Sequence, residues 1–290
     1  MGECRFNRQV SDDLIEKLKN EELWKKLKND CIKNRSLFLA LRKDNISFYY
    51  RGGRLFNFDK KKGKYGFSTH IKFATQLGTD YIRQDEIKKI NISNLDFYND
   101  YKKIKRNCEL FSDDEANGVS CLCKKSSYIL EKSKVVLDIE IGLKDEKKES
   151  NEKKKRNYID ILLYDTAAGE LRFIEAKLFK NDELWSESTP PIIEQINRYE
   201  KLIEDNPSDI LEGYATYIKR LNLIFDINLK PPKRINPKVS LLIFKYTPEE
   251  EKSNKFDKLL KILANKGIPT STIMYESDLD ANTIWEDTTT

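Results

Sequence analysis

The sequence is poor in the residues on which several functional classes depend. Its one histidine, His70, lies in an apolar run where a structural role is expected rather than catalysis. The five cysteines are odd in number and lack a framework spacing, which argues against a secreted protein built on disulfides. Cys121 and Cys123 enclose a single residue, fewer than zinc-binding pairs usually do, and no second pair follows. The composition therefore disfavours a structural zinc or iron–sulfur site.

Long hydrophobic runs are also absent. No stretch approaches the ~20 apolar residues that a membrane-spanning helix requires. The opening residues, MGECRFNRQVSDD, lack the apolar segment of a signal peptide and do not complete a myristoylation pattern. These absences predict a soluble, cytoplasmic protein without a membrane partner.

The balance of charge is mild. Lys and Arg number 53 against 48 Asp and Glu, so the net charge is +5. This balance permits a polyanionic partner without requiring one, because a local basic face matters more than the total. The lysine runs at 60–64 and 102–106 are either phosphate contacts or solvated faces. Likewise Tyr49, Tyr50 and Arg51 either stack on exposed bases or pack within a hairpin.

Residues 1–108 predict a small α+β domain that recognises a partner or substrate. Ser11 is a typical N-cap for a helix through VSDDLIEKLKNEELWKKLKND. Four short runs, SLFLALR, ISFYYR, RLFNF and GFSTHIKF, then predict strands, with the clearest hairpin turn at the Gly-Gly pair. Two further helices are expected near 81–89 and 95–107.

Residues 109–280 predict a second domain, and 281–290 a loose tail. The expected order of elements is helix, three strands, helices, strand, helix, strand. Residues 144–156 contain no hydrophobic side chain and predict a loop between two paired strands. The segment PPIIEQINRYEKLIEDN opens with proline and has apolar residues at helical spacing, which predicts a helix over 192–204. The run VSLLIFKY is typical of a buried central strand.

Charged residues interrupt two neighbouring strands of this second domain. In IDILLYDTAAGELRFIEAKLF, Asp160 lies in the first apolar run, and Glu175 and Lys177 lie in the second. Side chains alternate along a strand, so Glu175 and Lys177 share a face, and hairpin register brings the first acid near them. Burying such charges is costly unless a divalent cation neutralises the acids. We therefore expect the three groups to surround a metal ion.

The same residues indicate chemistry on a phosphodiester. The carboxylates of Asp160 and Glu175, with the backbone carbonyl of Ala176, are hard oxygen ligands that suit Mg²⁺, for which Mn²⁺ is a substitute. Such an ion makes its bound water more acidic, and Lys177 orients that water or stabilises charge on a phosphate. Asp165, which ends the first strand, is expected to support the turn instead.

This pattern resembles the PD-(D/E)XK nuclease superfamily. Asp160, followed by Glu-Ala-Lys on the next strand, is similar to the signature of that family, although Ile159 stands where the family often has proline. Gln195 and Tyr199, four residues apart on one helix face, are similar to the Q-x-x-x-Y motif of RecB-like and archaeal mismatch-type members. The likeness covers about 107–276 and implies a restriction-endonuclease-like α-β-β-β-α-β core, an α/β (α+β) fold with a mixed central sheet.

The resemblance also implies roles for the site residues. Asp160 and Glu175 would bind the metal, and Lys177 would position the attacking water. Gln195 would hold that water or a metal ligand, and Tyr199 would contact a backbone phosphate or brace the lysine. The glutamate that the family often has on the first core helix stays open, because Glu109, Glu115 and Glu131 are all candidates. Asp138 and Glu140 also stay open: they either assist a second metal or form an ordinary strand face.

These expectations describe a Mg²⁺-dependent endodeoxyribonuclease that acts on DNA, in restriction or anti-phage defence. The alternatives are a catalytically silent nucleic-acid-binding or assembly subunit, an RNase, or a DNA-repair nuclease on the same scaffold. RNA as the partner, a protein partner bound through 1–108, and a homodimer are left open.

Overall fold

The computed structural model describes residues 6, 8–75, 81–84, 95–143, 157–186 and 189–289, which form two compact units. Unit 1 comprises Met1–Phe6, Lys125–Ala215 and Lys230–Thr290, and unit 2 comprises Asn7–Lys124 and Thr216–Leu229. Two helices, α5 (Asp114–Ser126) and α7 (Pro207–Phe225), each begin in one unit and end in the other. Each unit is therefore built from separate stretches of the chain.

The expected domain boundary at residue 108 falls inside unit 2. This unit continues through most of α5 and also takes in the later segment Thr216–Leu229. Packing between distant residues explains the difference, since the ring of Trp24 lies 5.9 Å from that of Phe225. Contacts across so long a stretch of chain leave no local signal in the sequence.

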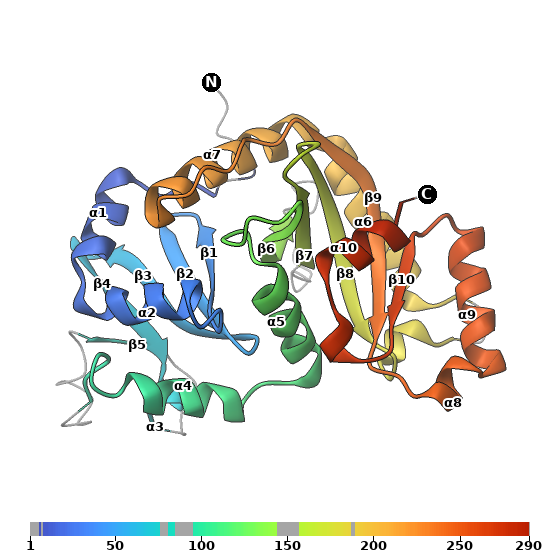
Figure 1. Ribbon diagram of the computed structural model, residues 1–290, viewed down its shortest axis with the longest axis horizontal. Coiled ribbons are helices and arrows are strands. Elements are labelled where there is room, and N and C mark those ends of the chain that lie inside the picture. The colour runs from blue at the N-terminus through green and yellow to red at the C-terminus, as the bar shows by residue number, and fades with distance from the viewer. Residues whose placement is uncertain are drawn as a thin grey trace, which may run out of the picture. The chain divides into compact units, whose positions relative to one another are not determined.

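Unit 2 is built on one antiparallel sheet, which follows chain order (Figure 1). Its strands are β1 (Phe38–Arg42), β2 (Asn45–Tyr50), β3 (Gly53–Lys61), β4 (Lys64–His70) and β5 (Tyr81–Arg83). The four predicted strands are found, but the fourth ends at His70, and the residues that follow it begin the helix α3 (Ile71–Thr75). The Gly-Gly turn between β2 and β3 is confirmed, and Gly52 there has φ of 76°, a conformation that glycine adopts without strain.

The helices of unit 2 agree with the sequence in part. They are α1 (Asp12–Asn20), α2 (Glu22–Ile32), α3 (Ile71–Thr75) and α4 (Tyr101–Leu110). Ser11 caps α1 as expected, because its side chain accepts a hydrogen bond from the N–H of Leu14 at 3.1 Å. The single helix expected here is divided at Glu21, whose backbone is extended. The prediction of a helix near 81–89 is wrong at its start, because Tyr81–Arg83 form β5, which pairs with β4. Residues 85–94 lie outside the described residues.

Unit 1 is built on a mixed sheet with the order β10-β9-β8-β7-β6 (Figure 1). Its strands are β6 (Lys134–Leu143), β7 (Asn157–Asp165), β8 (Glu170–Leu178), β9 (Arg234–Phe244) and β10 (Thr270–Ile273). The first three are antiparallel, whereas β9 runs parallel to both β8 and β10. The strand predicted from VSLLIFKY is β9, and its position between two strands accounts for its apolar run. The expected loop 144–156 lies outside the described residues.

Helices follow the strands of unit 1 in the predicted order. Besides the shared α5 and α7, they are η2 (Asp182–Leu184), α6 (Pro191–Asp205), α8 (Pro248–Glu251), α9 (Asn254–Asn265), η3 (Glu276–Asp278) and α10 (Ala281–Asp287). The helix predicted over 192–204 is α6, which begins with Pro191 in its first turn. The coarse expectation of a mixed α and β protein is thus confirmed.

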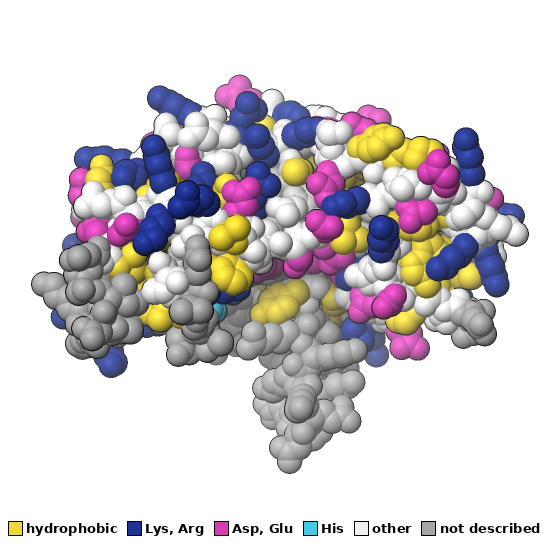
Figure 2. Space-filling model, turned by 90° about the horizontal axis from the view of Figure 1, so that it is seen from below, with side chains coloured by type: hydrophobic (Ala, Val, Ile, Leu, Met, Phe, Trp, Pro, Cys, Tyr) yellow, Lys and Arg dark blue, Asp and Glu magenta, His cyan; other side chains and the backbone are white. Residues whose placement is uncertain are grey.

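The surface is charged but mixed in sign. On the face in Figure 2, Lys and Arg side chains lie among Asp and Glu side chains rather than in one basic patch. None of the helices in the described ranges is long and apolar enough to cross a membrane. No disulfide joins the four cysteines within those ranges, which are Cys31, Cys108, Cys121 and Cys123.

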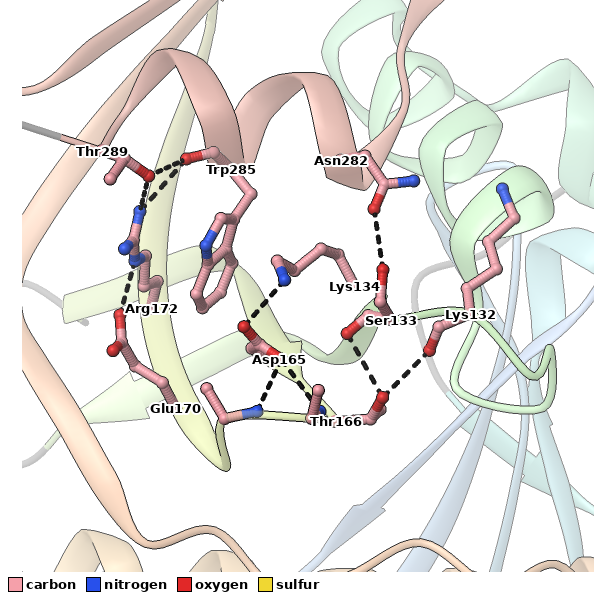
Figure 3. Close-up of polar contacts among 12 residues, drawn as sticks. Lys132, Ser133, Lys134, Asp165, Thr166, Glu170, Arg172, Asn282, Trp285 and Thr289 are labelled. Carbon is pink, nitrogen blue, oxygen red and sulfur yellow. Dashed lines mark hydrogen bonds and ion pairs between the residues drawn. The ribbon is translucent and has the colours of Figure 1, made fainter.

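The prediction of a loose tail over 281–290 is wrong, because most of this segment forms α10 and packs against the sheet (Figure 3). Ile284 and Trp285 are buried. The guanidinium of Arg172, on β8, lies 4.0 Å from the centre of the Trp285 ring and donates to its carbonyl at 3.1 Å. Arg172 also donates to Oγ1 of Thr289 at 3.0 Å. The anchor for this segment is thus a residue far away in the sequence.

Asp165 supports the β7–β8 turn, as expected (Figure 3). Its Oδ1 accepts from the N–H groups of Ala167 and Ala168, each at 2.9 Å, and its Oδ2 accepts from Nζ of Lys134 at 2.7 Å. Burial alone would raise the pKa of this carboxyl, but those hydrogen bonds and the lysine charge together hold the pKa below its usual value. Asp165 is therefore a structural acid.

Candidate functional site

The two acids predicted to meet lie where the β7–β8 ladder ends. Paired positions run from Asp165 with Glu170 to Ile161 with Ile174. Asp160 is the next residue of β7, and its Oδ2 accepts a hydrogen bond from the N–H of Ala176 at 2.9 Å. This side chain therefore lies against the backbone between Glu175 and Lys177, which fulfils the predicted proximity.

Glu175 and Lys177 form a buried ion pair on one face of β8. Nζ of Lys177 lies 2.8 Å from Oε1 of Glu175. The exposed fractions are 1% for Glu175 and 6% for Lys177, so a solvated strand face is excluded. A buried pair of this kind is weak evidence for stability, because removing both charges from water offsets much of their attraction. Stability alone therefore does not account for this pair.

Helix α6 brings two more predicted residues to the same carboxylate. Nε2 of Gln195 donates to Oε1 of Glu175 at 2.6 Å and also contacts Oη of Tyr199 at 2.8 Å. The Tyr199 hydroxyl in turn donates to the backbone carbonyl of Tyr158, on β7, at 2.5 Å. The four-residue spacing on α6 thus joins the helix to both strands. We call Asp160, Glu175, Lys177, Gln195 and Tyr199 the carboxylate cluster.

Tyr199 is held as a neutral hydroxyl. Burial, followed by the negative charges of Glu175 and Asp160, raises its pKa to about 12, although the hydrogen bond from Gln195 and the charge of Lys177 act in the opposite direction. The hydroxyl therefore remains a hydrogen-bond donor throughout the physiological range.

Sequence reasoning missed Glu183. This residue lies in η2, just after β8, and its Oε2 is 3.2 Å from Nζ of Lys177. Asn181 caps the short helix by accepting from the N–H of Glu183 at 2.9 Å. Lys177 therefore lies between two carboxylates, one buried and one about half exposed. An acid beyond the end of a strand has no periodic signal, so only the structure reveals this contact.

The cluster contains carboxylate and carbonyl oxygens, which are the type of ligand that Mg²⁺ takes. One carboxylate oxygen of Asp160 accepts from the backbone, and Oε1 of Glu175 accepts from Gln195 beside Nζ of Lys177. Mg²⁺ keeps several waters and takes only one or two protein carboxylates. Within the described ranges, no group of three or more His, Cys, Asp or Glu side chains is placed to hold a metal. The described side chains therefore form no closed protein cage for a metal.

Two acids of β6 that sequence reasoning left open have different surroundings. Asp138 is fully buried, and its carboxylate accepts from the hydroxyl of Tyr214 at 3.1 Å and from the N–H of Ile139 at 2.9 Å. Glu140 has φ of 48° and falls between two paired positions that place it opposite Asp160. Of these two, only Glu140 lies across from the cluster.

The three glutamates considered for the first helix are dispersed. Glu109 is the penultimate residue of α4 in unit 2, where its carboxylate lies 3.2 Å from Nε of Arg51. Glu115 is in the first turn of α5, also in unit 2. Glu131 is exposed in the segment before β6. None of these positions identifies a further member of the cluster.

Comparisons with known proteins give little. No protein-family model matches the chain, and no curated protein matches it. Among solved structures, SfsA of Pyrococcus furiosus in complex with Ca²⁺ matches over 84% of this chain and 87% of its own. The identity is 14% and the TM-score is 0.22, an agreement too low to assign a fold family or a function.

Proposed function

We propose that this protein is a metal-dependent phosphodiesterase that cleaves DNA as an endonuclease. The observation that carries the proposal is the carboxylate cluster, in which two acids from neighbouring strands, a lysine and a Gln–Tyr pair are joined by hydrogen bonds. The order of elements in unit 1 and its mixed sheet are consistent with the PD-(D/E)XK resemblance. A use in restriction or anti-phage defence rests on analogy with that family alone.

In this proposal Asp160, Glu175 and the carbonyl of Ala176 hold Mg²⁺, with Mn²⁺ as a substitute. When bound, such an ion lowers the pKa of its water and neutralises charge on the phosphate. Lys177 supplies a fixed positive charge beside Glu175, where it orients a water molecule or stabilises charge that develops on phosphate oxygens. Each role requires charge buried on a rigid strand, which β8 provides.

The residues of α6 position the acids. Gln195 holds one oxygen of Glu175, which leaves the orientation of this carboxylate fixed relative to the helix. Tyr199 fixes Gln195 and ties it to β7 through the carbonyl of Tyr158. Charged side chains that are held in this way need not reorganise during the reaction. Such preorganisation is a main source of catalysis by charged groups.

The decisive experiment is nicking of supercoiled plasmid DNA with Mg²⁺ and with EDTA. The wild type is compared with Lys177→Ala and with Lys238→Ala, a matched control that removes a half-exposed lysine paired with Glu200. We expect cleavage only with Mg²⁺, a loss of at least 100-fold in Lys177→Ala, and no change in Lys238→Ala.

Other outcomes would change the proposal. Equal nicking by wild type and Lys177→Ala would refute the role of the lysine. Binding of DNA without Mg²⁺-dependent cleavage would favour a silent binding subunit. Labelled RNA and DNA of one sequence, tested side by side, distinguish an RNase from a DNase.

A further inference from the structure

Tyr158 is a large aromatic residue beside the carboxylate cluster, which uses only its backbone. It precedes Asp160 by two residues on β7, so the two side chains lie on the same face of the strand. Along this face Leu162 and Tyr164 are fully buried, whereas Tyr158 is 44% exposed. The face therefore opens to solvent at Tyr158, next to the proposed metal ligand.

The position of Tyr158 is tied to that of Glu175. Its carbonyl accepts the 2.5 Å hydrogen bond from Tyr199, and Gln195 links Tyr199 to the Glu175 carboxylate. A substrate group that rests on the Tyr158 ring is thereby held at a fixed position relative to the cluster. An exposed aromatic ring on a mobile loop would lack this coupling.

The ring of Tyr158 packs beside Gly142, where there is no side chain in the way. The two residues are paired across β6 and β7, and a Cβ added at Gly142 would lie 3.0 Å from Cε1 of Tyr158. One edge of the ring thus lies against the glycine backbone, while much of the side chain faces solvent. Aromatic residues also cover glycines in sheets for stability alone, so the test must separate that role from ligand binding.

We propose that Tyr158 is a nucleobase-stacking residue, and that the cluster acts on a DNA strand with an unstacked base beside the scissile phosphate. This inference rests on the proposed function. An aromatic side chain stacks on any base whose face is free, independently of sequence. In continuous duplex the faces of the bases are covered by their neighbours, so such a site binds single strands in preference.

Binding of a fluorescent single-stranded oligonucleotide and of its duplex tests the inference. Anisotropy is measured with Ca²⁺, a hard cation for the same oxygen donors, and the strand is recovered to verify that it is intact. The proteins are wild type, Tyr158→Leu, Tyr158→Phe and Tyr275→Leu. Leucine retains an aliphatic cover over Gly142 without a stacking face, and Tyr275 is a 55% exposed tyrosine elsewhere in unit 1.

We expect Tyr158→Leu to weaken single-strand binding at least fivefold and duplex binding less than twofold. Tyr158→Phe and Tyr275→Leu should bind within twofold of wild type. Wild-type single-strand affinity in Tyr158→Leu overturns the inference. An equal loss for single strand and duplex also overturns it, because that pattern reports damage to the fold.

Cleavage of the same strands by wild type with Mg²⁺ separates this inference from the proposed function. If the wild type cleaves the strands and Tyr158→Leu binds them normally, the stacking role of Tyr158 is overturned and the proposed hydrolysis stands. Binding that depends on Tyr158 without any cleavage overturns hydrolysis and leaves a single-strand binding site. Absence of wild-type binding to both probes overturns both.

Discussion

At the scale of single residues, two aspartates of one strand show how position decides role. Asp160 meets the backbone of Ala176 beside two charged residues, whereas Asp165 accepts three hydrogen bonds at a turn. Both lie at ends of the same ladder. The oxygens of Asp165 bind the turn and Lys134, whereas Asp160 lies beside Glu175 and Lys177, so our proposal gives the first acid a chemical role and the second a structural one.

Substitution by asparagine separates these roles. Asp160→Asn keeps an oxygen that accepts from Ala176 but loses the charge, so we expect cleavage to fall at least 100-fold with stability changed by less than about 1 kcal/mol. Asp165→Asn should retain cleavage and lose about 1–3 kcal/mol of stability, because a buried charge-assisted contact with Lys134 is removed. Urea denaturation and nicking assays on both variants provide the check, and the reverse pattern would contradict the assignment.

The stability loss in Asp165→Asn should depend on pH. The pKa of Asp165 is depressed in the folded state, so its contribution is present above the ordinary carboxyl pKa of about 4 and disappears as pH falls through the depressed value. The difference between variant and wild type should therefore shrink in acid. A difference that is constant from pH 7 to pH 3 would show that the charge of Asp165 is not its cause.

Tyr199 gives a prediction of opposite sign. Its pKa rises from an ordinary value of about 10 to about 12 on folding, so the unfolded chain releases its proton first. Stability from this group is complete below pH 10 and is lost between pH 10 and pH 12. Tyr199→Phe lacks the titrating group, and its unfolding free energy should fall less than that of wild type over this window. Urea denaturation at pH 8 and pH 10.5 measures the difference, and parallel profiles would contradict it.

At the scale of elements, the sequence predicted what local patterns encode. Apolar runs and turn residues located β1 to β4 and β6 to β9, and hairpin register brought Asp160 to the strand of Glu175 and Lys177. A strand as short as β5 has too few residues for a period to show. The contact of Glu183 with Lys177 and the burial of α10 arise between distant segments, and no local pattern records them.

The packing of α10 can be measured directly. Trp285 is buried beneath the guanidinium of Arg172, so Trp285→Ala should lower the unfolding free energy by about 3–5 kcal/mol. Tyr275→Ala, in the exposed segment before η3, serves as the control and should cost less than about 0.5 kcal/mol. Chemical denaturation of both variants tests this. Equal denaturation midpoints would show that α10 adds nothing to stability, as expected of a loose tail.

At the scale of the whole molecule, the segments that build the two compact units alternate along the sequence. Unit 2 includes Thr216–Leu229 from the second half of α7 onward. Within that segment Tyr217 and Leu221 are fully buried, and the Tyr217 hydroxyl accepts from the N–H of Leu41, on β1, at 3.4 Å. Unit 2 is therefore incomplete without a segment that follows the carboxylate cluster in the chain.

This interleaving predicts how fragments behave. A fragment of residues 7–124 keeps Phe48 beside Trp24, its only tryptophan, but lacks Phe225 and the rest of 216–229, and it should show no cooperative unfolding. The same fragment joined by a flexible linker to 216–229 should regain a cooperative transition in Trp24 fluorescence, because burial of Phe225 and its neighbours restores the core. A fused control with Phe225→Ser should lose most of that gain. Cooperative unfolding of 7–124 alone, at the midpoint of the fusion, would show that the N-terminal chain forms a domain by itself.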